Sequence, residues 1–433
     1  MTNGNTLRLI PALLAVAFSG SAMAAGFQLL EQNASGIGNA YAGSAAIADN
    51  ASTIFFNPAG MTKLQNREAS AGLSLVRPSF KFTDKGSTIA PATGGGDGGD
   101  AGDWAAVPNG YVSWAVAKDL YVGLGISSPF GLQTNYENDW VGRFQAIKFD
   151  IKTININPSI AYRVNDMVSV GAGLNWQRIE AEYVRRLATA VSVVPAINTI
   201  AQNTRVTLEL DDDSWGWNAG VLFDLSPATR VGLSYRSSIK HDLKGSLSFD
   251  PNTLVADVKA KASIELPDTV ILSGTHKLND RWTLLGDVSW TGWSDIQKVD
   301  IIRTTSGGTA TTAAGSTAQT LETKFRDTWR VALGGTYALN SAWDLKFGVA
   351  YDQTPVRKAT ERLVSLPDSD RLWVSVGGQW KVSKEARVDL GAAYLFVDDT
   401  NIDNNQSTSA RGRVKGTYDS DVWLLGAQYS VAF

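Results

Sequence analysis

Very few residues of this chain could carry out covalent chemistry. Its 433 residues include no cysteine and only two histidines, His241 and His276. A disulfide, a thiol nucleophile and a thiolate metal site are therefore excluded, and a histidine-rich metal site nearly so. Hydrolysis would usually need a histidine beside a nucleophile or an acid. The net charge of −3 is too small to indicate nucleic acid as a partner. We expect no enzyme, no cofactor and no metal.

Binding chemistry remains, and two cations are its candidates, Arg185 and Lys324. A carboxylate in a partly dry interior needs such a partner. Both cations lie where polar and apolar residues alternate, and the register of each stretch turns them inward. The alternative for Arg185 is a structural arginine paired with an interior carboxylate. Arg330, on the same face as Lys324, is expected to pair with an inward acid such as Asp287 and to be structural.

The elements that must position these side chains are strands with one apolar face. The clearest is the last, Trp423 to Phe433, where bulky apolar residues alternate with small or polar ones. A soluble protein would normally fray at such an end. The same alternation recurs after about residue 68, with Trp, Tyr and Leu on nearly every apolar face. This predicts lipid contact by a closed transmembrane β-barrel, whose last strand pairs with its first.

Two kinds of connection alternate along the chain. Long polar loops such as residues 86–103 and 303–319 need no packed core. The short connections hold turn-forming residues and are Ala117–Leu120, Val164–Met167, Ser226–Arg230, Leu278–Arg281, Leu339–Ala342 and Val382–Ala386. Six short turns with room for two strands and a loop between them predict an all-β membrane protein of about fourteen antiparallel strands. Short turns face the periplasm in outer-membrane barrels, so both termini should be periplasmic.

The N-terminal residues predict two further parts. Residues 1–24 have a basic start at Arg8, an apolar run and an A-x-A site at Ala22–Ala24, typical of a secretory signal peptide. Residues 25–67 lack strand periodicity and are rich in small and apolar residues, which favours a plug inside the barrel of residues 68–433. The alternative is a flexible periplasmic tail. Asn57, Pro58 and Ala59 would fix a turn of this plug, or form a purely structural turn.

An ordered series of short motifs covers the whole mature chain. They are A-G-F-Q-L at Ala25–Leu29, S-G-I-G-N-A-Y-A-G at Ser35–Gly43, A-I-A-D at Ala46–Asp49, N-P-A at Asn57–Ala59, S-P-F-G-L at Ser128–Leu132, T-I-N-I-N-P-S at Thr153–Ser159, W-G-W-N-A-G at Trp215–Gly220, S-Y-R-S at Ser234–Ser237, L-P-D at Leu266–Asp268, F-R-D-T-W-R-V-A-L-G at Phe325–Gly334 and L-P-D-S-D-R at Leu366–Arg371. In this series the chain resembles the FadL/TodX-type outer-membrane transporters of long-chain fatty acids and hydrophobic compounds.

The resemblance implies a fourteen-stranded barrel plugged by an N-terminal hatch. It also implies an outer hydrophobic groove, a tighter pocket near the hatch, and release through a gap in the wall. Arg185 aligns with a family arginine that contacts ligand. The family lysine falls nearer Leu321, a departure from the pattern, and Lys324 is its nearest substitute.

Other ligand contacts implied by the resemblance are apolar. Phe27 and Leu29 would touch the ligand if the mature N-terminus reaches the pocket. Phe130 and Leu132 are candidates for the outer groove or the wall gap, and Gly131 between them could mark a bulge or kink.

The function expected is passive uptake of long-chain fatty acids, by a monomer in contact with outer-membrane lipid. The alternative is uptake of neutral hydrophobic compounds such as monoaromatic hydrocarbons or alkanes. A general porin predicts an open charged constriction, against which the plug-like segment argues, and an adhesive role of the long loops stays open. Phe433 is expected to be the residue through which the barrel-assembly machinery binds the chain.

Overall fold

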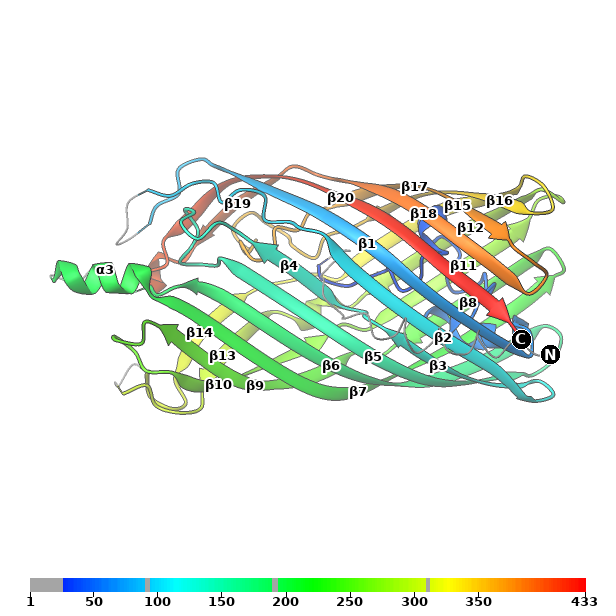
Figure 1. Ribbon diagram of the computed structural model, residues 1–433, viewed down its shortest axis with the longest axis horizontal. Helices are drawn as coiled ribbons and strands as arrows, with labels where there is room; N and C mark the ends of the chain where they lie inside the picture. The colour runs from blue at the N-terminus through cyan, green and yellow to red at the C-terminus, as the bar shows by residue number, and fades with distance from the viewer. Residues whose placement is uncertain (1–25, 90–93, 189–193, 309–311) are drawn as a thin grey trace, which may run out of the picture.

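The computed structural model describes residues 26–89, 94–188, 194–308 and 312–433, and they form a closed antiparallel β-barrel (Figure 1). The signal peptide predicted for residues 1–24 lies outside the described residues. Twenty strand segments make one sheet, and the barrel has fourteen strands because six of them are interrupted once. The predicted fold class is therefore confirmed. Among the helices of the described residues, none is both long and apolar enough to span a membrane.

The strands follow one another around the barrel in chain order. They are β1 (Arg67–Asp84), β2 (Ala105–Ala117), β3 (Leu120–Ser127) with β4 (Gly131–Asn135), β5 (Lys148–Arg163), β6 (Val168–Arg186), β7 (Arg205–Ser226), β8 (Thr229–Arg236) with β9 (Ile239–Asp250), β10 (Val258–Leu266) with β11 (Thr269–Lys277), β12 (Trp282–Thr291) with β13 (Lys298–Arg303), β14 (Thr317–Glu322) with β15 (Thr328–Ala338), β16 (Trp343–Asp352), β17 (Arg371–Lys381), β18 (Ala386–Val397) with β19 (Thr400–Asn405), and β20 (Arg413–Ala432).

The barrel closes between its first and last strands. β1 and β20 pair antiparallel from Glu68 opposite Ala432 to Asp84 opposite Gly416. All six predicted short turns join neighbouring strands at one end, called here the short-turn end, where the C-terminus also lies (Figure 1). The opposite, long-loop end carries the long connections and the helix α3 (Pro195–Asn203). Closure leaves no unpaired edge for a lipid environment to desolvate.

Side chains alternate between the two faces of the wall as the sequence predicts. In β6, Val170 and Leu174 are exposed on the outer face, whereas Ser169, Asn175 and Arg185 are buried on the inner face. The outer apolar face gives way to charged residues beyond Trp176, with Arg178 and Glu180 pointing outward. The long-loop half of β6 therefore extends past the apolar band, and Arg185 lies in that extension.

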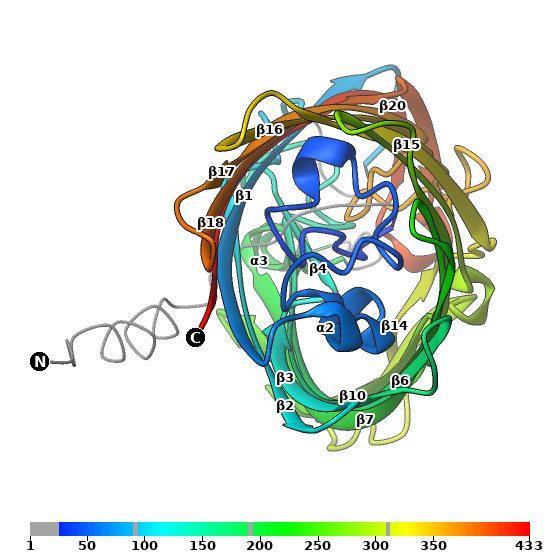
Figure 2. The ribbon, with the colours of Figure 1, turned by 90° about the vertical axis from the view of Figure 1, so that its right-hand side faces the viewer.

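Residues 26–66, called here the luminal segment, lie inside the barrel (Figure 2). The segment holds two short 3₁₀ helices, η2 (Ile37–Asn39) and η3 (Pro58–Lys63), and the helix α2 (Thr53–Phe56). It packs against wall glycines: a Cβ on Gly377 would lie 2.8 Å from the Cα of Gly38, and one on Gly391 would lie 2.7 Å from the Cβ of Ile37. Glycines inside strands here allow the close approach of another backbone.

The wall is interrupted between β3 and β4, at Ser128, Pro129 and Phe130. Both pieces pair with β5, so this is one strand with a break. The luminal segment occupies the break: the N–H of Leu29 donates to the carbonyl of Pro129 at 2.8 Å, and the N–H of Gly131 donates to the carbonyl of Phe27 at 2.9 Å. A break in the strand thus lies directly before Gly131, where the sequence predicts a bulge or kink, and hydrogen bonds from the luminal segment bridge it.

Candidate functional site

A cavity of about 590 Å³ opens at the long-loop end of the lumen, and three arginines line it. Arg185 comes from the end of β6, Arg303 from the end of β13, and Arg411 from the loop between β19 and β20. This space is called here the arginine cavity. None of the three arginines forms an ion pair with a carboxylate among the described residues.

The three guanidinium groups are held by neutral acceptors. The Nε of Arg185 donates to the side-chain oxygen of Gln319 at 2.9 Å, and its Nη1 donates to the carbonyl of Arg186 at 2.9 Å. Arg303 and Arg411 donate to Ser316, Thr317, Gln406 and Ala318.

Several buried donors at this cavity have no acceptor among the described residues. They are the Nε atoms of Arg303 and Arg411 and the Nε2 of Gln319. A buried donor without an acceptor is costly, and a charged one more so. The arrangement therefore favours an anion with free oxygens.

The pKa values of the cavity arginines also favour an anion at this place. Burial first, and then the nearby Arg411, lower the pKa of Arg185 to about 9. Burial also lowers the pKa of Arg411. Two carboxylates, Glu322 and Glu361, line the wider cavity, but neither lies within ion-pair distance of the arginines, and Glu322 pairs with Lys324 at 2.9 Å. The charged form of Arg185 is thus penalised until an anion approaches it.

An aromatic cluster formed by Phe27, Phe130, Trp293 and Phe325 lies on the inside of the barrel. The ring centroids of Phe27 and Trp293 are 4.9 Å apart, and those of Trp293 and Phe325 are 5.9 Å apart. The cluster belongs to a buried apolar core that also contains Leu132 and Tyr183. Three predicted contacts, Phe27, Phe130 and Leu132, are therefore in one apolar region. Tyr183 extends this region to the arginine cavity, because it lines a small space of about 10 Å³ with Arg185.

Leu29 lies elsewhere than the other predicted apolar contacts. It packs in a separate core cluster, and it lines a cavity of about 50 Å³ together with Phe55, Phe130 and Arg330. Phe130 borders this cavity as well as the aromatic cluster, so it is the link between the two. The structure thus does not bring Leu29 to the arginine cavity.

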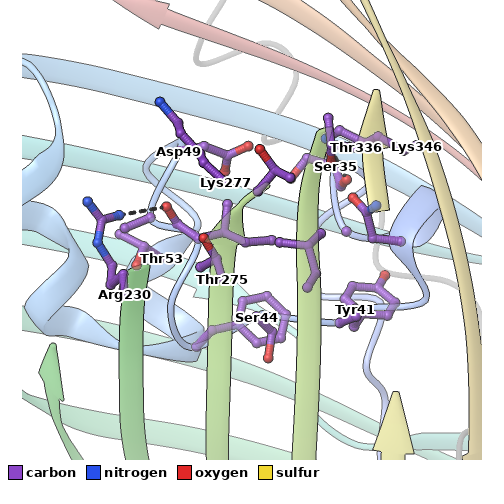
Figure 3. Close-up of a pocket in the computed structure, with 18 of the residues that line it drawn as sticks. Ser35, Tyr41, Ser44, Asp49, Thr53, Arg230, Thr275, Lys277, Thr336 and Lys346 are labelled. Atoms are coloured by element: carbon purple, nitrogen blue, oxygen red, sulfur yellow. Dashed lines mark hydrogen bonds between the residues drawn. The ribbon is translucent and has the colours of Figure 1, made fainter. Parts of the chain in front are cut away.

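A third cavity, of about 370 Å³, separates the luminal segment from the wall at the short-turn end (Figure 3). Ser35, Tyr41 and Asp49 of the luminal segment face Arg230 and Lys346 of the wall across it. Two of its cations are paired, because Arg230 lies 2.8 Å from Asp224 and Lys346 lies 2.8 Å from Asp389. Lys277, which also lines this cavity, has no ion pair among the described residues. The arginine cavity differs in that all three of its arginines lack an ion pair among the described residues.

The predicted turn Asn57-Pro58-Ala59 anchors the luminal segment. The fully buried Asn57 accepts from the N–H of Ala59 at 3.1 Å and so caps η3, with Pro58 at the first helical position. Its Nδ2 donates to the carbonyl of Ala45 at 2.8 Å and to that of Val221 in β7 at 3.1 Å. One side chain thus ties the turn to the rest of the segment and to the wall.

Two expectations for the strand through Trp329 are not met. Lys324 precedes β15 and has a left-handed φ of 48°, so the strand alternation that predicted an inward orientation does not extend to it. Its side chain is half exposed at the rim of the arginine cavity. Arg330 is buried but donates to the carbonyl of Ala40 at 2.6 Å, while Asp287 accepts from Ser44 at 2.7 Å. The luminal segment thus forms a hydrogen bond with each of them, although the Nε of Arg330 has no acceptor among the described residues.

Sequence reasoning missed Arg303 and Arg411. The sequence predicts that Arg303 begins the long polar loop 303–319, whereas the structure makes it the last residue of β13. Arg411 lies next to Gly412 in the connection before β20 and has no strand register. The signal that could have found them is their position at the end of, or beyond, strands on the long-loop side of the barrel.

The fold and these cavities define a class: a β-barrel of the outer membrane with its lumen occupied by the N-terminal segment. Residues 15–433 match the family model described as outer membrane protein transport protein (OMPP1/FadL/TodX). The chain belongs to this family of outer-membrane transporters of hydrophobic compounds.

Curated relatives and solved structures agree with the family. The chain is 30% identical to the long-chain fatty acid transport protein of Escherichia coli (strain K12), with 96% of each chain covered. It is 33% identical to outer membrane protein P1 of Haemophilus influenzae, with 100% of each covered. A crystal structure of a Pseudomonas aeruginosa FadL homologue has a TM-score of 0.83 at 25% identity, covering 94% of this chain and 99% of that one. The toluene transporter TodX of Pseudomonas putida, at 16% identity and a TM-score of 0.67 (95% and 100% covered), shares the fold.

Proposed function

We propose that this protein takes up long-chain fatty acids passively across the outer membrane and binds their carboxylate in the arginine cavity. The observation that carries the proposal concerns buried donors on Arg303, Arg411 and Gln319, beside Arg185. Among the described residues, these donors lack an acceptor and the arginines of the cavity have no carboxylate partner. A fatty acid carboxylate would supply the missing acceptor, and bonds between charged groups are stronger than neutral ones.

The acyl chain would follow the apolar side chains that begin next to Arg185. Val206, Leu208 and Leu247 surround the small space beside it, and the core continues to the aromatic cluster. Since that space holds only about 10 Å³, side chains must shift to admit a chain. Each methylene that enters would contribute about 0.8 kcal/mol, so the tail would supply most of the affinity.

We assign residues 25–67 the role of a hatch and residues 68–433 that of the barrel. The hydrogen bonds of Phe27 and Leu29 across the break between β3 and β4 support a route through the wall. If this part of the hatch moved, the break at Pro129 would lose the bonds that bridge it. Phe130 borders both the aromatic cluster and the break, so it is well placed to contact a leaving ligand. The role of Lys324 in binding, at the rim of the cavity, stays a prediction.

Uptake of neutral hydrophobic compounds is the second candidate. It is favoured by the aromatic cluster, which contains no charged group. A neutral molecule would, however, leave the donors of the arginine cavity without an acceptor. The two candidates therefore differ in whether the cavity arginines matter.

Binding of oleate, oleyl alcohol and toluene to the purified barrel tests the proposal. A charge-assisted hydrogen bond to the carboxylate contributes about 1.5–3 kcal/mol. Arg185→Gln and Arg411→Gln each remove at least one such bond and should each weaken oleate binding at least tenfold. Both variants should leave oleyl alcohol binding unchanged. Arg178→Gln, which removes an arginine from the outer face, is the control. Equal oleate affinity in all variants, or saturable toluene binding with none of oleate, would overturn carboxylate recognition.

The remaining expectations concern the neighbours of the barrel. Phe433 is 65% exposed, and its N–H donates to the carbonyl of Arg67 at 3.0 Å. An exposed terminal aromatic on a paired strand is compatible with its proposed recognition by the barrel-assembly machinery.

His241 is fully buried between Asp212 and Gln177, and His276 contacts Thr229 beside a short turn. Neither histidine lines the arginine cavity or the cavities of about 370 Å³ and 50 Å³, and we propose a transporter without catalysis.

A further inference from the structure

Four lysines gather on the outer face of two neighbouring strands, β9 and β10, in the long-loop half of the barrel (Figure 1). Lys240, Lys244, Lys259 and Lys261 are all exposed, together with Asp242 on the same face. The alternate residues His241, Leu243 and Ala260 are buried on the inner face. This set is called here the lysine patch. None of its four ammonium groups has an ion pair or a side-chain hydrogen bond among the described residues.

The pairing register makes this arrangement unfavourable by itself. Lys244 lies directly opposite Lys261, on the same face of the sheet. Like charges at directly opposed positions destabilise a pair of strands. The patch therefore gains most from a partner that brings negative charge to both lysines at once.

The nearby carboxylates do not meet that need. Asp211 lies opposite Lys244 on the other side, but Arg178 holds it at 3.0 Å and also contacts Glu180 and Asp213. On β9 and β10, Asp242 accepts from Ser263 at 2.9 Å, and Glu265 accepts from Ser238 at 2.8 Å. The lysines therefore share this face with carboxylates, one of which, Glu265, lies opposite Lys240. They form no ion pair with these carboxylates among the described residues, and Lys244 and Lys261 remain opposed.

The depth of the lysine patch relative to the membrane determines which anions can reach it. Trp215 and Trp217 are exposed on the outer face of β7, and Trp217 packs on Tyr235 with ring centroids 5.1 Å apart. Exposed Trp and Tyr mark the membrane interface in outer-membrane barrels. The hydroxyl of Ser214, next to Trp215, donates to the carbonyl of Lys240 at 2.7 Å, so the patch begins at this aromatic level.

Lys244 lies further along the same strand, four residues beyond Lys240, or roughly 13 Å of chain at strand spacing. The patch therefore extends from the interface outward through the level of lipid headgroups. We propose that the lysine patch binds the phosphorylated headgroup of the glycolipid in the outer leaflet. Its partner is a multiply phosphorylated lipid A moiety, whose phosphates would bridge Lys244 and Lys261.

Native mass spectrometry of the purified full-length barrel in detergent, titrated with diphosphorylated lipid A, tests this inference. EDTA is kept present, so that divalent cations do not link the lipid to carboxylates. A lysine near an anionic surface contributes about 1 kcal/mol to binding. The double variant Lys244→Gln/Lys261→Gln should therefore weaken lipid A binding about 30-fold. Lys152→Gln is the matched control, because Lys152 lies in the same cross-strand row and is already paired with Asp150 at 3.1 Å.

Two further arms separate the possible sources of negative charge. Monophosphorylated lipid A should bind the original barrel more weakly, and 10-fold molar excess inorganic phosphate should not compete. Competition by phosphate alone, equal loss in the Lys152 control, or unchanged lipid A binding in the double variant would each overturn the proposal. Without lipid, the double variant should melt at the same temperature or higher, because its like-charge pair is gone. A lower melting temperature would contradict the argument from repulsion.

Discussion

Replacing one wall glycine should loosen the luminal segment without touching any proposed ligand contact. Gly232 lies in β8, and a Cβ there would be 2.6 Å from the carbonyl carbon of Ala45 and closer still to its oxygen. Gly232→Ala must therefore push the backbone of Ala45 away from the wall. That carbonyl accepts from Asn57 at 2.8 Å, and the N–H of Ala45 donates to Ser273 at 3.0 Å, so both hydrogen bonds are put at risk.

The size of the effect follows from these contacts. Overpacking costs about 1–3 kcal/mol, and each of two buried hydrogen bonds about 1 kcal/mol. Docking of the luminal segment should weaken by about 3–5 kcal/mol, so amide hydrogen exchange around residues 44–60 should quicken by about 100-fold or more. Hydrogen exchange detected by mass spectrometry on the refolded barrel measures this directly.

A glycine on the neighbouring strand provides the control. Gly274 is in β11, one position from the partner of Gly232, and a Cβ on it would meet nothing within 4 Å. Gly274→Ala should leave exchange in the luminal segment unchanged. If both variants exchange alike, the wall glycines do not hold the segment in place and the packing argument fails.

Three other expected outcomes follow from single contacts. Asn57→Ala removes the bonds to Ala45 and Val221 and should cost about 2–4 kcal/mol, seen as a lower thermal midpoint. Lys346→Met leaves the buried Asp389 without its partner at 2.8 Å and should cost about 3–5 kcal/mol, whereas a Lys346→Met/Asp389→Leu double variant should recover much of it; no recovery would contradict the pairing. Oleate should raise the thermal midpoint more than oleyl alcohol, and Arg185→Gln should reduce the difference, since burial lowers the pKa of Arg185 to about 9 and an anion relieves that penalty.

The sequence predicts the same barrel that the structure shows, because strands and turns are recognised from short stretches of neighbouring residues. A strand alternates its side chains every two residues, so the register of β6 could be followed from Ser169 to Arg185 without knowing its neighbours. Turn residues mark the short-turn end in the same local way. The orientation of Arg185 follows from this alternation alone.

The tertiary structure alone decides which side chains come together in the lumen and which residues pair across neighbouring strands. Arg303 ends β13 and Arg411 lies in the connection before β20, and they meet Arg185 only because the closed barrel brings these three places to one end. The partner of Arg330 turned out to be the carbonyl of Ala40, since the luminal segment lies between the arginine and Asp287. The opposition of Lys244 and Lys261 depends on a register that one residue of slip would abolish. Sequence determines which face a strand residue takes, because that is set by its own backbone; which groups meet across the lumen depends on distances that only the closed barrel fixes.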